Sequence, residues 1–93
     1  MSQSITLNVP VELSPQDWEK VAAVFRELDG WMESNEACWY GHENDKKYIT
    51  ASAEPGGLLL EGEIDGGLWT GWISVLCAKL TLALGREIHD AEM

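Results

Sequence analysis

The stretch LLLEGEIDGGLWTGWISVLCAKLTLALG, residues 58–85, predicts one strand followed by one long helix. Its three leading leucines favour a strand with apolar contacts on both faces at one point. Glu61 and Glu63 then alternate toward solvent. Asp65 is a good residue to cap the start of a helix, and Gly85 is a natural stop, so we expect a helix to fill the interval between them.

The apolar surface of this expected helix is wider than one small sheet requires. We expect its buried face to comprise Trp69, Trp72, Ile73, Leu76, Cys77, Leu80, Ala83 and Leu84. Leu68, Val75 and Leu82 form a separate row at a spacing of seven, and exposed apolar rows of this kind need a cover. The cover is either the N-terminal strand or C-terminal tail, or a second copy in a homodimer through this helix. The candidate residues of that dimer face are Leu68, Trp72, Val75, Lys79 and Leu82.

Upstream, alternating apolar residues in 4–13 predict a strand. Pro10 restricts this strand to an edge of the sheet, or to pairing with a neighbour on only one side of that residue. Ser14-Pro15-Gln16-Asp17 is a strong helix start, and that helix is expected to end at Gly30. Residues 31–35 are ambiguous. Further strands are expected over residues 37–42, 47–53 and 58–64, with a short last one within 86–92. The order is β-α-β-β-β-α-(β), which predicts one α+β domain over residues 1–93. We expect two layers, an antiparallel sheet of four or five strands with two helices on one face.

The chain is strongly acidic, with 16 acidic and 6 basic residues in 93 and a net charge of −10. The hydrophobic content of 45 % indicates a folded body and not a disordered acidic tail. Such a charge repels nucleic acid and anionic membranes, so we expect neither as a direct partner. It attracts basic proteins, or it serves only to keep a small protein soluble. We expect no signal peptide and no membrane-spanning run, and Cys38 and Cys77 form no CxxC pair. A cytoplasmic protein with reduced thiols is therefore expected.

No catalytic, cofactor or metal motif is visible in the sequence. Cys38 and His42 lie four apart in an expected strand, a spacing that holds the side chains too far apart to chelate a metal easily. Glu61 and Glu63 share one strand face and are expected to be solvated. The expected protein is therefore not an enzyme and carries no cofactor and no metal.

Five tryptophans in 93 residues exceed what a plain fold requires. Trp31 follows the first helix, and Trp39 lies beside Tyr40. Neighbours in a strand face opposite ways, so one of Trp39 and Tyr40 is expected to point away from the helices. Aromatic residues ringed by charge are typical of binding hot spots. The candidate partner-binding residues are Trp31, Glu33, Glu36, Trp39, Tyr40, Glu43 and Asp45. The alternative for Trp31 is a lid over the edge of the core.

The C-terminal half resembles small bacterial proteins of the toxin-immunity kind. The resemblance covers about 40 residues, and the segments that carry it are Glu54-Pro55-Gly56-Gly57-Leu58, Gly62, Asp65, Trp69, Leu80, Ala83-Leu84-Gly85 and His89-Asp90-Ala91-Glu92. It implies a cytoplasmic antitoxin that blocks a cognate toxin domain by tight contact, and it assigns no role to any single residue.

Three functions remain open from the sequence. The first is an immunity or inhibitor protein that occludes a basic toxin or effector domain, with acidic residues steering the encounter. The second is a dimeric acidic secretion chaperone for an effector, which the wide apolar arc of the second helix would suit. The third is a phage anti-defence inhibitor that mimics the charge of DNA, which would need acidic residues in regular rows.

Overall fold

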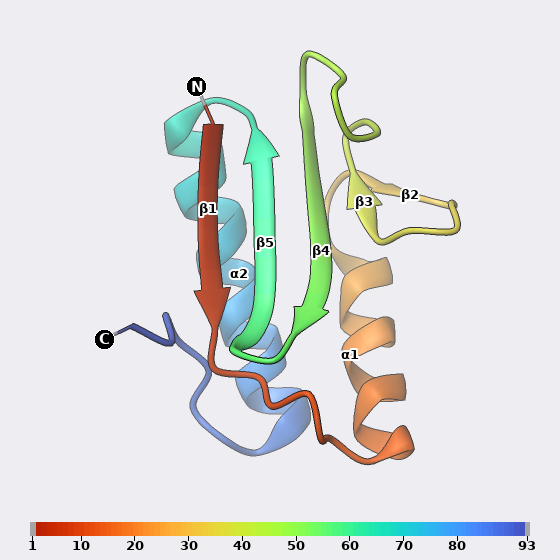
Figure 1. Cartoon of the computed structure of the whole chain (residues 1–93), viewed down its shortest axis with the longest axis vertical. Helices are drawn as coiled ribbons and strands as arrows, with labels where there is room; N and C mark the ends of the chain where they lie inside the picture. The colour runs from red at the N-terminus through yellow and green to blue at the C-terminus, as the bar shows by residue number, and fades with distance from the viewer. Residues whose placement is uncertain (1, 93) are drawn as a thin grey trace.

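The structure is a computed structural model that describes residues 2–92 (Figure 1). The α+β prediction is confirmed, because an antiparallel sheet of five strands packs against two helices. The elements are β1 (Ser2–Leu7), α1 (Pro15–Glu27), β2 (Trp31–Met32), β3 (Cys38–Trp39), β4 (Tyr48–Glu54), β5 (Gly57–Glu63) and α2 (Gly66–Leu84).

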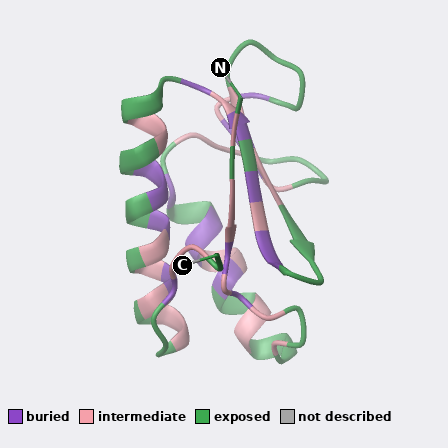
Figure 2. Cartoon of the chain, turned by 60° about the vertical axis from the view of Figure 1, so that its left-hand side comes forward, coloured by how far each residue is buried: buried purple, intermediate pink, exposed green. Residues whose placement is uncertain are grey.

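The sheet runs in the order β1-β5-β4-β3-β2, and every pairing is antiparallel. Both helices lie on one face, so the sheet has an inner face toward the helices and an outer face (Figures 1 and 2). The first strand is an edge strand, as predicted, but Pro10 is not the reason, because it lies beyond the end of β1 at Leu7. Register fixes which residues share a face. Leu58, Leu60 and Gly62 point inward and are buried, whereas Glu61 points outward and is exposed.

Both helices begin where the sequence predicted, and α2 ends at Gly85 as expected. α1 ends earlier than predicted, at Glu27 and not at Gly30. The Ser14 hydroxyl accepts a hydrogen bond from the Asp17 backbone N–H at 3.1 Å, and Pro15 occupies the first helical turn. The Asp65 carboxylate accepts one from the Leu68 N–H at 3.0 Å. Each side chain satisfies an N–H that the first turn leaves without an intrahelical partner.

Three strand predictions need correction. The first strand ends at Leu7 and not near residue 13, because its partner β5 starts at the tight turn where Leu7 pairs with Leu58. The expected strand over 37–42 shrinks to β3, and the ambiguous segment supplies β2 as its partner. The expected last strand is reduced to a single bridge between Leu7 and Asp90.

The hydrophobic core lies between the sheet and the helices as one cluster. The predicted buried face of α2 is confirmed, with Trp72, Ile73, Leu76 and Leu80 buried. The partly buried residues Trp69, Cys77, Ala83 and Leu84 pack against the same core.

Candidate functional site

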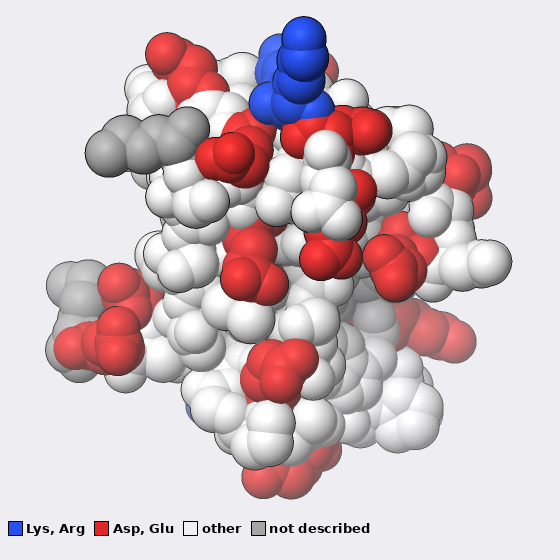
Figure 3. Space-filling view, turned by 45° about the horizontal axis from the view of Figure 1, so that its top comes forward, with Lys and Arg blue, Asp and Glu red and all other residues white. Residues whose placement is uncertain are grey.

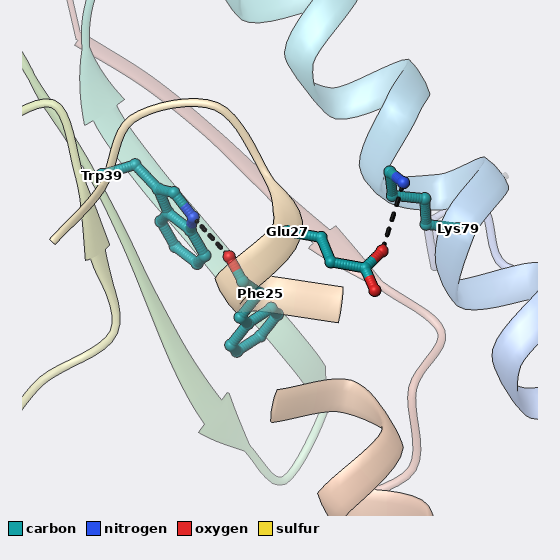
Figure 4. Close-up of polar contacts among 4 residues, drawn as sticks. All are labelled: Phe25, Glu27, Trp39 and Lys79. Atoms are coloured by element: carbon teal, nitrogen blue, oxygen red, sulfur yellow. Dashed lines mark hydrogen bonds and ion pairs between the residues drawn. The ribbon is translucent and has the colours of Figure 1, made fainter. Parts of the chain in front are cut away.

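Trp39 is a core residue, and its prediction as a partner contact is wrong. Its side chain is fully buried and makes edge-to-face contacts with three rings, those of Phe25, Trp31 and Trp72. Its indole Nε1–H donates to the Phe25 carbonyl at 3.0 Å (Figure 4). Of the neighbouring pair Trp39 and Tyr40, Trp39 is therefore the one that points toward the helices. A residue so enclosed is held for stability and cannot reach a partner.

Trp31 forms a lid over this aromatic cluster, which is the alternative that the sequence left open. Its ring lies edge-on to Trp39 with 5.6 Å between centroids, and it is only partly buried. Its Nε1–H donates to the Glu33 carboxylate at 3.0 Å. Trp31 and Glu33 thus bind each other at the surface, so Glu33 is already engaged before any partner arrives.

Tyr40 is fixed in place by contacts on three sides. Its backbone adopts a left-handed φ of 69°, which is unusual for a residue with a side chain. Its hydroxyl donates to Asp29 at 2.6 Å, and the Lys47 ammonium lies 4.7 Å from the ring centroid. Its ring packs so closely over Gly30 that a Cβ there would lie 2.7 Å from ring carbons. These contacts fix the turn at Tyr40, which ends β3 and reverses the direction of the chain.

The Tyr40 contacts predict a loss of stability at high pH. Burial, the hydrogen bond to Asp29 and the Asp29 charge raise the pKa of Tyr40 to about 12. The unfolded tyrosine ionises near 10, so the extra stability is fully present below about pH 10. This extra stability is lost as the pH rises through the pKa of about 12 that Tyr40 has in the folded chain. We expect the urea midpoint of the wild type to fall over this interval. The midpoint of Tyr40→Phe should fall less, because it has no Tyr40 hydroxyl to ionise.

Absorbance at 295 nm provides the control, because it reports tyrosinate directly. The folded wild type should show a late ionisation that Tyr40→Phe lacks. A Tyr40 that ionises near pH 10 in the folded chain would contradict the Asp29 contact.

Two of the predicted acidic residues converge on a hollow in the outer face of the sheet. Glu36 and Glu43 line it together with Glu61 from β5, and its volume is about 390 Å³. The other lining residues are Asn35, Ala37, Thr50, Ala51 and Ser52. We call this feature the acidic hollow. No basic side chain is among its described lining residues, and Figure 3 shows acidic side chains spread over this side of the molecule.

The carboxylates of the acidic hollow are not engaged elsewhere. Glu36, Glu43 and Glu61 form no side-chain hydrogen bond or ion pair within residues 2–92. Asp45 differs, because its carboxylate accepts from the His42 backbone N–H at 2.8 Å and braces the turn before β4. The arrangement therefore offers three unpaired negative charges beside the Thr50 and Ser52 hydroxyls, a set of acceptors suited to a cationic group.

The expectation that Cys38 and His42 lie too far apart is wrong. The Cys38 sulfur is 3.7 Å from His42 Nδ1, because β3 ends at Trp39 and the left-handed Tyr40 turns the chain back. Cys38 is only 2 % exposed, so its thiol is inaccessible to a substrate in this conformation. No group of three metal-ligating side chains occurs within residues 2–92. The other thiol, Cys77, is partly buried, and burial together with the nearby Asp90 charge raises its pKa.

The predicted dimer face divides into buried and exposed members. Trp72 is only 4 % exposed and its Nε1–H donates to the Asp29 carbonyl at 3.1 Å, so its prediction as a dimer contact is wrong. Lys79 is bound to Glu27 of α1 at 3.3 Å (Figure 4). Leu68 packs partly against the core. Val75 and Leu82 are 48 % and 85 % exposed.

Sequence reasoning missed the place of Glu61, Thr50 and Ser52 in the acidic hollow. The sequence predicts that Glu61 faces outward, but it does not predict its neighbours. The structure places them, because Thr50 pairs with Glu61 on one side and with Cys38 on the other, which brings the loop before Cys38 near Glu61. Alternation along β4 could have placed the two hydroxyls on that face. Comparison of the chain with known proteins finds no matching family model, no matching curated protein and no matching solved structure.

Proposed function

We propose that this chain is a non-catalytic protein-binding domain, an inhibitor of the immunity type that covers a basic toxin or effector domain. The observation that carries the proposal is the acidic hollow, where Glu36, Glu43 and Glu61 present three unpaired carboxylates on one face. The net charge of −10 supports it, since long-range attraction speeds the encounter with a positively charged partner.

The mechanism is occlusion. An arginine or lysine of the partner enters the acidic hollow and exchanges its water for carboxylate and hydroxyl oxygens. A guanidinium suits this set best, because its planar fork of donors can meet two carboxylates at once. The outer faces of β4 and β5 then cover the surface around that cation, which keeps the partner from its own substrate.

The first test removes the charges of the acidic hollow. A triple variant with Glu36→Gln, Glu43→Gln and Glu61→Gln changes the net charge from −10 to −7 and keeps the side-chain size. The proposal requires that a neighbouring gene encode a basic toxin or effector domain, and that protein is the probe for calorimetry and for rescue of growth on co-expression. We expect the dissociation constant to rise about 30-fold or more, because loss of a desolvated charge pair costs about 2 kcal/mol or more.

The matched control removes three exposed charges elsewhere, with Glu12→Gln, Glu19→Gln and Glu92→Gln, and reaches the same net charge of −7. This control should slow association as much as the first triple variant does, because both lose the same amount of long-range attraction. Its dissociation rate and its rescue of growth should stay like those of the wild type. Equal losses in the two triple variants would show that only overall charge matters, and would contradict the acidic hollow as the binding site.

A further inference from the structure

The second helix presents a long face to solvent that carries no charge. Its exposed residues are Gly66, Gly67, Thr70, Gly71, Ser74, Val75, Ala78 and Leu82. In Figure 2 this exposed side of α2 faces away from the sheet. The expected covers are absent within residues 2–92, since β1 lies in the sheet and the C-terminal segment pairs along Thr6 to Asn8.

This uncharged face is unusual on a chain with a net charge of −10. Two copies repel each other over most of their surface, so they meet with the least repulsion where no carboxylate intervenes. The only charged side chain of α2, that of Lys79, is already bound to Glu27 of α1. The face itself therefore presents no carboxylate to a second copy, and the Glu27 carboxylate that borders Leu82 is paired with Lys79.

The sequence of the face is complementary to itself. Large residues and small residues alternate along it at heptad spacing, as Leu68, Gly71, Val75, Ala78 and Leu82. An antiparallel pairing centred between Leu76 and Cys77 sets Leu82 opposite the partner's Gly71. It also sets Val75 opposite the partner's Ala78. Small residues let two helix backbones approach closely, and the large ones then fill the space above them.

The same face fits a lipid surface poorly. α2 is the one helix within residues 2–92 that is long and apolar enough to span a membrane by length and composition. However, its other side packs on the sheet through Trp72 and Leu76. Helices that lie on membranes carry large apolar residues and flanking lysines or arginines, whereas glycine, serine and threonine occupy much of this face.

We propose that two copies of the chain associate through an antiparallel pairing of their α2 helices, with Val75 near the centre of the interface and Leu82 toward each end. A helix of 19 residues is about 28 Å long, so the interface is at the small end for a stable dimer and the association is reversible. The inference does not rest on the proposed function, because the acidic hollow lies on the opposite layer and stays open in the dimer.

The test is sedimentation equilibrium of the full chain over a range of concentrations, in about 0.3 M salt to screen general repulsion. The wild type should move toward twice the single-chain mass of 10.3 kDa as concentration rises. Val75→Glu buries a carboxylate in the interface and should remain a single chain. Val11→Glu is the matched control, because Val11 is exposed to 43 % and Val75 to 48 %. It should dimerise as the wild type does.

Far-UV circular dichroism should show the same folded content in both variants. A wild type that stays single at every concentration overturns the proposal. Equal behaviour of the two glutamate variants overturns it as well. Flotation with neutral phosphatidylcholine vesicles is the second measurement. Flotation of the wild type but not of Val75→Glu would assign the face to lipid and overturn the dimer.

Discussion

Trp39→Ala should destabilise the chain by about 3–5 kcal/mol, the usual cost of emptying a tryptophan-sized site in a core. Trp39 is fully buried, and its removal leaves Phe25, Trp31 and Trp72 without their shared contact. The Phe25 carbonyl also loses its hydrogen bond from the indole. Because the free energy of unfolding of small domains is only about 5–15 kcal/mol, this substitution should remove a large part of it. Urea unfolding followed by circular dichroism measures it.

Two further variants separate the contributions. Trp39→Phe keeps an aromatic ring but loses the indole hydrogen bond and some volume, so it should cost roughly 1–3 kcal/mol. Trp31→Ala, which alters a partly buried lid, should cost about 1–2 kcal/mol. A loss below about 1 kcal/mol for Trp39→Ala would place this residue outside the core and reopen its role as a partner contact.

Gly57→Ala should cost roughly 2–4 kcal/mol, because the backbone around it has no space for a methyl group. Gly57 has a φ of 136°, a conformation that residues with a side chain rarely adopt. An added Cβ would collide with the Leu7 carbonyl oxygen and lie 3.1 Å from Thr6 Cγ2. The collision sits where β1 pairs with β5, so we expect the urea midpoint to fall and amide exchange to quicken along β1.

The adjacent glycine provides the control. Gly56 has open space around its Cβ position and no left-handed φ, so Gly56→Ala should change the stability by no more than about 0.5 kcal/mol. Equal effects at the two positions would mean that the turn tolerates the methyl group and that the β1–β5 contact is looser than described.

The sequence carried strong signals for the helices and weaker ones for the short strands. Ser14, Asp65 and Gly85 mark helix ends through local chemistry, and local chemistry can be read directly from neighbouring residues. In contrast, β2 and β3 have only two residues each, so no alternation is long enough to detect. The end of β1 at Leu7 depends on where its partner strand β5 begins, and that position is set by the turn between β4 and β5.

The candidate site was predictable only in part, because side-chain direction within residues 37–42 depends on one unusual backbone angle. The left-handed Tyr40 brings His42 back to Cys38, whereas a continuous strand would have kept them apart. Glu36 and Glu43 were predicted as partner contacts, and they do line the acidic hollow. Their meeting with Glu61 depends on sheet register, which no local pattern specifies.

The two proposed surfaces lie on opposite layers of the fold. The acidic hollow opens on the outer face of the sheet, and the uncharged face of α2 lies on the helical side. A dimer through α2 would therefore present two acidic hollows outward, and each could bind its own partner molecule. Binding of a partner and association of two copies are separable events, which the Val75→Glu variant tests without touching Glu36, Glu43 or Glu61.

The most direct measurement is a two-dimensional NMR titration of the isotope-labelled chain with the basic toxin or effector domain that the proposal requires a neighbouring gene to encode. The largest changes in backbone amide shifts should fall on residues 35–37, on Glu43, and on Thr50, Ser52 and Glu61 around the acidic hollow. Changes that concentrate on α1 or α2, while these amides stay unmoved in a saturated complex, would contradict the account.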